Sequence, residues 1–142
     1  MASTNIPAVK AAVLKVLESA KALEDITVSG DKEPERDTEY VWIYKAKAKR
    51  QFTTIGKQPA AQDEMVEVHL RVFAVDPGAT YTDVEARAVE IFEAVESALR
   101  DSPTLDGTAF FQHVEELEIE PLLLDQNWAC HVLVTLAAKT RI

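Results

Sequence analysis

The sequence predicts a single α+β domain in which a mainly antiparallel sheet of about four strands packs against two helices. Two amphipathic helical segments alternate with pairs of segments whose apolar residues recur at every second position. The chain has 142 residues, of which 47% are hydrophobic and 27% charged, as is typical of one globular domain. A sheet with an apolar face needs a covering layer, so we expect the helices and the sheet to share one core across residues 1–142.

The first helical segment runs from about Ile6 to Leu23. Asn5 offers a capping side chain, and Pro7 is tolerated in a first turn. The apolar residues that recur at helical spacing are Val9, Val13, Val16, Leu17 and Ala20. The stretch SGDKEPERDT near 29–38 combines glycine, proline and charge, so we expect an exposed loop there.

From Glu39 the periodicity changes to two, which is typical of a strand. Aromatic residues occupy one side of this strand (Tyr40, Trp42 and Tyr44), and aliphatic residues occupy the other. A second alternating segment, 65–74, is expected to pair with it in antiparallel fashion. The residues near 47–62 are more than a tight hairpin needs, which predicts a projecting loop.

The second helix is predicted over residues 83–101, with Thr82 and Glu85 in capping-box spacing. Its apolar stripe consists of Val84, Ala88, Ile91, Val95 and Leu99. Two further strands are expected around 110–123 and 128–138. In the last of these, alternate residues from Trp128 to Leu136 share one apolar face.

The sequence offers no combination of residues that indicates catalysis, a cofactor or a metal. His69, His113 and His131 fall on three different predicted strands, without a metal-ligand spacing. Cys130 is expected to be a small buried apolar residue. Glycine-rich phosphate loops and nucleophile elbows are absent from the sequence, and so are long apolar runs and a secretory signal. We therefore expect neither an enzyme nor a membrane protein.

Charge is distributed unevenly along the chain, which has a formal net charge of −9. This sign argues against tight binding of nucleic acid. A basic segment nevertheless begins at Lys45, and it either protects a solvated sheet edge or docks on the acidic strand or helix of a neighbouring copy in a head-to-tail ring. The acidic strand is equally explained as a solvated face. The candidate subunit or partner interface consists of Lys45, Lys47, Lys49, Arg50, Glu115, Glu116, Glu118 and Glu120.

The order of these segments resembles the tail terminator, or tail completion, proteins of long-tailed bacteriophages. The resemblance covers nearly the whole chain and is most marked in VHLRVFAVDPGATYTDVEARAVEIFEAVESAL, where a strand leads through a spacer into a regular helix. VKAAVLKVLESA, EYVWIYKAKAK and WACHVLVTLAAKT supply the other matching elements. It is a resemblance of pattern without a catalytic motif.

This resemblance implies a non-enzymatic structural protein without a cofactor. It would form a homohexameric ring that caps the tail tube, ends polymerisation and joins tail to head. The implied partners are further copies of itself, the major tail tube protein and a head-completion or connector protein, while DNA passes through the lumen without specific binding. The implied location is the head–tail junction of the virion, assembled in the host cytoplasm.

Besides a hydrolase or transferase whose catalytic groups come together from distant segments, two other interpretations remain open from the sequence. The first is another virion neck component, such as a head-completion or minor tail protein. The second is a cellular domain that binds a small ligand, with Tyr40, Trp42, Tyr44 and Phe73 lining an apolar pocket rather than packing in the core.

Overall fold

The computed structural model describes residues 4–52 and 62–141. The fold is α+β, as predicted, and its sheet has the strand order β1-β2-β3-β5-β4. Strands β2, β3, β5 and β4 are antiparallel to their neighbours, whereas β1 pairs with β2 in parallel. The elements are α1 (Ile6–Ser19), a 3₁₀ turn (Lys21–Leu23), β1 (Thr27–Ser29), β2 (Glu39–Phe52), β3 (Gln62–Val75), α2 (Tyr81–Arg100), β4 (Phe111–Leu124) and β5 (Asn127–Arg141).

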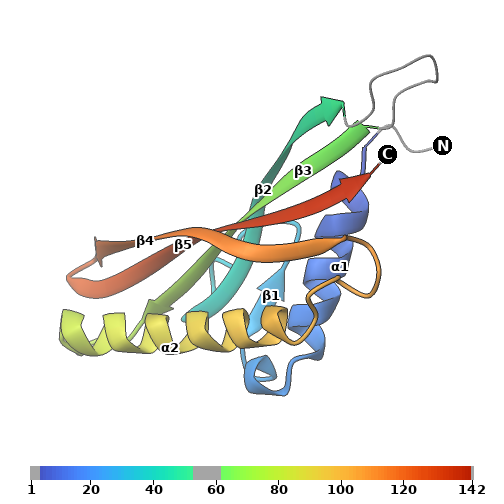
Figure 1. Ribbon diagram of the computed structural model, residues 1–142. Coiled ribbons are helices and arrows are strands. Elements are labelled where there is room, and N and C mark those ends of the chain that lie inside the picture. Colours follow the sequence, from blue (N-terminus) through green and yellow to red (C-terminus); the bar gives the residue numbers. More distant parts are fainter. Residues whose placement is uncertain (1–3, 53–61, 142) are drawn as a thin grey trace, which may run out of the picture.

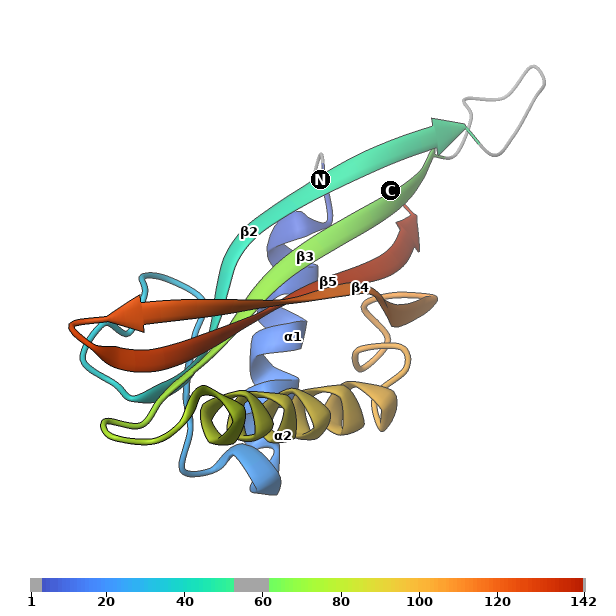
Figure 2. The same cartoon turned by 90° about the vertical axis from the view of Figure 1, so that its left-hand side faces the viewer.

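Both helices pack against the same face of the sheet. Helix α2 contacts β3, β4 and β5, and α1 lies between α2 and the β2 side of the sheet (Figure 1). Figure 2 shows β2 and β3 extending well past α2. We call the covered side the helix face and the opposite side the outer face. Within residues 4–52 and 62–141, no helix has the length and apolar character that crossing a membrane requires.

The core follows the alternation of the central strand. Val66, Val68, Leu70 and Val72 of β3 are fully buried on the helix face, while the residues between them point to the outer face. The predicted stripe of α2 is confirmed, whereas in α1 Val16 is only partly buried and Ala20 follows the end of the helix. Helix α1 buries Val9, Val13 and Leu17, and α2 buries the whole predicted stripe together with Phe92. The core is therefore built between one face of the sheet and two helices.

Helix α1 begins at Ile6, as predicted, whereas α2 begins two residues before its predicted start. Helix α2 starts at Tyr81 and is capped by Thr80, whose hydroxyl accepts a hydrogen bond from the Asp83 backbone N–H at 3.3 Å. The capping box expected at Thr82 is therefore wrong, because Thr82 already lies in the first turn. Asn5 is the N-cap residue of α1, but its side chain makes no capping bond.

The segment ends also differ from the prediction. Helix α1 stops at Ser19, and the last part of the expected helix is a 3₁₀ turn. Strand β2 continues through Phe52, so residues 47–52 belong to the strand pair rather than to a loop. The rest of the predicted projecting loop, 53–61, lies outside the described residues. The sheet has five strands instead of about four because Thr27–Ser29 pairs with Tyr40–Trp42.

Candidate subunit interface

The sheet has two long edges without a strand partner in the described part of the chain. Strand β4 has β5 on one side only, along all its 14 residues. Strand β1 pairs with the edge of β2 that is turned away from β3, but only as far as Trp42. This edge of β2 is therefore open from Ile43 onward. An open edge presents unpaired backbone N–H and C=O groups, which form a template for another strand.

The open part of β2 carries a row of lysines on the outer face. Lys45, Lys47 and Lys49 are exposed. They pair in register with His69, Glu67 and Met65, whose side chains point away from the helices. Lys47 Nζ lies 3.4 Å from the Glu67 carboxylate, and about half of its side chain remains exposed. We call these three residues the lysine row.

The edge strand β4 carries a matching acidic row on the same face. Glu116, Glu118 and Glu120 are exposed and pair in register with Thr135, Leu133 and His131 of β5. We call them the glutamate row. Glu115 lies at a register shift between Val114 and Glu116, outside the row. The structure therefore places the lysine row and the glutamate row on one face, at opposite edges of the sheet.

The Arg50 side chain lies on the opposite face of β2 from the lysine row, because successive strand residues point to opposite faces. It pairs in register with Glu64, whose side chain is fully buried on the helix face, and its Nε donates to the Glu64 carboxylate at 3.1 Å. Arg50 thus belongs to the contacts of Glu64 on the helix face and is not part of the lysine row on the outer face.

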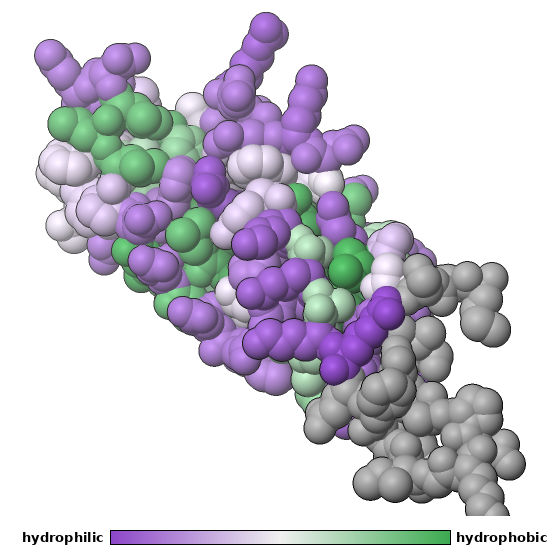
Figure 3. Space-filling model, turned by 90° about the horizontal axis from the view of Figure 1, so that it is seen from above, coloured by the Kyte–Doolittle hydropathy of each residue, from purple (hydrophilic) through white to green (hydrophobic). Residues whose placement is uncertain are grey.

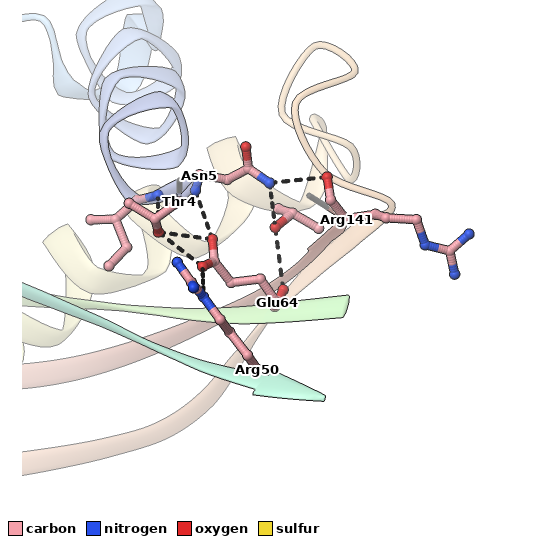
Figure 4. A network of polar contacts seen from close by, with 7 residues as sticks. Thr4, Asn5, Arg50, Glu64 and Arg141 are labelled. Atoms are coloured by element: carbon pink, nitrogen blue, oxygen red, sulfur yellow. Dashed lines mark hydrogen bonds and ion pairs between the residues drawn. The ribbon is translucent and has the colours of Figure 1, made fainter. Parts of the chain in front are cut away.

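Glu64 holds the start of α1 against the strands (Figure 4). Its carboxylate accepts a hydrogen bond from the Asn5 backbone N–H at 2.7 Å and one from the Thr4 hydroxyl at 2.9 Å. The Asn5 amide, instead of capping its helix, donates to Thr140 Oγ1 at 2.9 Å. A buried carboxylate thereby receives both charge compensation and hydrogen bonds.

The sequence contains a signal for Glu64 that the pattern analysis missed. Glu64 shares the parity of Val66 and Val68, so it is a charged residue at a position where the alternation predicts the apolar face. A charge in such a place requires a partner. The predicted strand 65–74 begins one residue after Glu64, whereas β3 begins at Gln62.

The helix face of the two open edges is apolar. Leu117 and Ile119 of β4 alternate with the glutamate row and remain 46% and 38% exposed. Ala46 and Ala48 of β2 alternate with the lysine row and are partly buried. Each edge therefore has a charged side and an apolar side.

Most of the outer face is polar, with a local apolar patch. Figure 3 shows polar side chains over much of this view and apolar ones gathered at its left-hand end, where Figure 1 places the β4–β5 hairpin. Leu124 is a large exposed apolar residue of that hairpin. Leu123 and Trp128 are also exposed, but they pair with each other and share the parity of the buried Cys130, so they lie on the helix face. Trp128 packs edge-on against Tyr81 with ring centroids 5.5 Å apart.

The aromatic residues of β2 pack on one another across the outer face. Tyr40 stacks on Phe73 with ring centroids 4.8 Å apart. The Arg71 guanidinium lies 5.4 Å from the ring centroid of Trp42 and 5.2 Å from that of Tyr44. These mutual contacts favour the packing interpretation of the aromatic strand over the interpretation in which it lines a ligand pocket.

His131 lies beside this cluster, 5.2 Å from the Phe73 ring. Burial, assisted by the positive charge of Arg71 and opposed by Glu33, lowers the pKa of His131 to about 4. Burial also lowers the pKa of His69. Both imidazoles are therefore held neutral in the folded chain at pH values where an unfolded chain already binds protons.

We expect this difference to reduce stability as pH falls. Below about pH 6.5 the unfolded state takes up a proton at His131 that the folded state does not bind until about pH 4. The His131 contribution should amount to about 2 kcal/mol between pH 7 and pH 4, allowing for its partial exposure. Urea titrations of wild type and His131→Gln across this range measure it. Parallel stability curves for the two proteins would contradict the expectation.

The described residues do not assemble a metal site, and their one cysteine is buried. Within residues 4–52 and 62–141, no three His, Cys, Asp or Glu side chains are grouped so that they could hold a metal. Cys130 is fully buried, as expected, with the Tyr81 hydroxyl 3.7 Å from its sulfur, and burial raises the pKa of its thiol. A raised thiol pKa disfavours the reactive thiolate.

Comparison with known proteins identifies a similar fold. No protein-family model and no curated protein matches the sequence. A chain from the solved structure described as the virion of a native gene transfer agent particle superimposes with a TM-score of 0.54 at 11% sequence identity. The match covers 98% of this chain and 100% of that chain. At this identity the likeness shows that the two chains share an α+β fold over their full lengths.

Proposed function

We propose that this chain is a non-enzymatic structural protein of a tailed virion or virion-like particle, and that it forms the ring that terminates the tail tube. The observation that carries the proposal is the end-to-end fold match with a chain of a gene transfer agent virion. The resemblance of its segment order to tail terminator proteins agrees with this role. The proposed partners are further copies of the chain, the tube protein and a connector or head-completion protein.

The two charged edges support a role that depends on assembly. The lysine row and the glutamate row lie at opposite ends of one sheet, so a copy can meet its neighbour through unlike surfaces. Unlike surfaces produce head-to-tail contacts, which close into a ring when the rotation allows it. Copies that each carry a formal charge of −9 would give the ring a negative surface, along which DNA moves without being retained.

Termination of a tube can be measured directly. Purified tube protein is polymerised with and without this chain, and tube lengths are counted by negative-stain electron microscopy. We expect shorter tubes with this chain at one tip, and a ring of about six 15.7 kDa copies by light scattering, either in solution or released from tubes. Bovine serum albumin serves as the protein control.

The result also separates related roles. Unchanged tube lengths and bare tips would contradict tail termination. If the chain bound a purified connector but never a tube tip, the role of a head-completion protein would replace it.

A further inference from the structure

We propose that copies of this chain join by extending the sheet, with the open edge of β2 in one copy pairing antiparallel to β4 of the next, and Lys47 opposite Glu118. The inference rests on the proposed function for the ring and adds which strands close it. It is argued from strand direction, from the match of both faces in one register, and from charge.

The strand directions permit this pairing without any rearrangement. Strands β2, β3, β5 and β4 alternate in direction across the sheet, so β2 and β4 run in opposite directions within one chain. A second copy placed beside the first in the same orientation therefore brings its β2 antiparallel to β4. The outer faces of the two copies then form one continuous surface.

One register matches the two edges on both faces. The β2 edge reads Lys-Ala-Lys-Ala-Lys over 45–49, and the β4 edge reads Glu-Leu-Glu-Ile-Glu over 116–120. With Lys47 opposite Glu118, the three lysines of the row all face glutamates on the outer face. The pairs formed are Lys45–Glu120, Lys47–Glu118 and Lys49–Glu116.

The same register also matches the helix face. It places Ala46 opposite Ile119 and Ala48 opposite Leu117, so small side chains meet the large apolar ones that β4 leaves exposed. A slip of one residue would direct each charged row against an apolar row, because neighbouring strand residues point to opposite faces. The match on two faces therefore excludes slips by an odd number of residues, and among the remaining registers this one alone pairs all three lysines with glutamates.

Charge selects this arrangement over symmetrical pairs. Two β4 edges joined to each other would oppose glutamate rows, and two β2 edges would oppose lysine rows. Like charges directly across a sheet are destabilising. Only the unlike pairing remains, and it leaves one open edge at each end of any growing chain of copies until the ring closes.

One end of the proposed ladder coincides with features that limit pairing on both strands. On β2, strand β1 covers the edge as far as Trp42. On β4, Pro121 lacks a backbone N–H and so weakens a ladder at its position. Counted from Lys47 in the proposed register, Pro121 falls opposite Tyr44, which lies at the register shift of β2 between Ile43 and Lys45. The new ladder therefore begins at Lys45, just after β1 and this irregularity end.

Charge reversal with complementation tests the pairing. The variant Lys45→Glu/Lys47→Glu/Lys49→Glu has two acidic edges, and Glu116→Lys/Glu118→Lys/Glu120→Lys has two basic ones. Each alone should assemble about 100-fold more weakly than wild type, while an equimolar mixture should assemble again by alternating the two variants. Light scattering gives the masses. Circular dichroism of each variant shows that the fold is retained.

A disulfide trap tests the register itself. Lys47→Cys combined with Glu118→Cys should yield covalent multimers under mild oxidation, since directly opposed residues have Cβ atoms about 5 Å apart. Within one chain β3 and β5 separate the two positions, so the bond can form only between copies. Lys47→Cys with Glu90→Cys, whose second site lies on the exposed side of α2, is the matched control and should stay monomeric on denaturing gels.

The outcomes separate this inference from the proposed function. Normal assembly of both reversal variants, or no more cross-linking than in the control, would overturn the edge pairing even if the chain caps tubes. A wild-type chain that is monomeric at all concentrations and on tubes would also overturn it. Conversely, complementation and cross-linking without any effect on tube length would uphold the pairing and reject tail termination.

Discussion

Replacing Glu64 with alanine should destabilise the fold by about 3–5 kcal/mol, one of the two largest effects that we expect from a single substitution. The Glu64 side chain is fully buried, and its carboxylate accepts hydrogen bonds from the Thr4 hydroxyl, the Asn5 backbone and Arg50. Alanine removes the acceptor and leaves the Thr4 hydroxyl and the Asn5 backbone N–H without this partner. An unpaired buried donor or charge costs more than the intact interaction contributes.

Chemical denaturation of wild type and variants measures this cost. Glu64→Gln retains the size of the side chain but not its charge, and is expected to fall between wild type and Glu64→Ala. Glu90→Ala is the control, because the Glu90 side chain is 70% exposed and pairs with Arg87 on the surface of α2. It should change the unfolding free energy by less than about 1 kcal/mol. A Glu64→Ala protein as stable as this control would show that the buried network contributes little.

The Glu64 network also bears on assembly. It joins Arg50 of β2 and Glu64 of β3 to Asn5 at the start of α1. Arg50 directly follows Lys49 of the lysine row. The orientation of the β2 edge thus depends on a buried contact on the opposite face of the same strand. A loosened network would disturb the edge without touching any lysine.

Sequence periodicity predicted the elements that contribute most to the core. The stripe from Val84 to Leu99 and the alternation of β3 both repeat often enough to specify a buried face. Strand β1 is not predicted by the sequence pattern, because three residues are too few to show a periodicity. Residues 47–52 fall within the predicted loop because lysine and alanine both have low strand propensity, and pairing with β3 decides their structure.

The candidate interface was only partly visible in the sequence. Alternation indicated that the lysines share a face and that the glutamates share another, but strand order depends on contacts between distant segments. Only the structure shows that both rows lie on the outer face at opposite edges. It also separates Arg50 and Glu115 from these rows, the first by its binding to Glu64 and the second by its place at a bulge.

Two leucines on neighbouring strands should show that the helix face contributes more to stability than the outer face. Leu70 of β3 is fully buried beneath the helices, and Leu70→Ala is expected to cost about 3–4 kcal/mol through lost burial and the cavity left behind. Leu133 of β5 pairs with Arg71 on the outer face, and its side chain is only partly buried. Leu133→Ala removes the same atoms there and should cost about 1 kcal/mol.

Urea denaturation at constant pH and salt gives both values. Equal costs would mean that the outer face contributes to stability as much as the helix face does. The expected inequality has a consequence for assembly. Because the free energy of folding comes mainly from the helix face, the outer face can carry rows of charge at both edges with little loss of stability. A sheet stabilised from one side can therefore present its other side and its edges to neighbouring copies while remaining folded as a single chain.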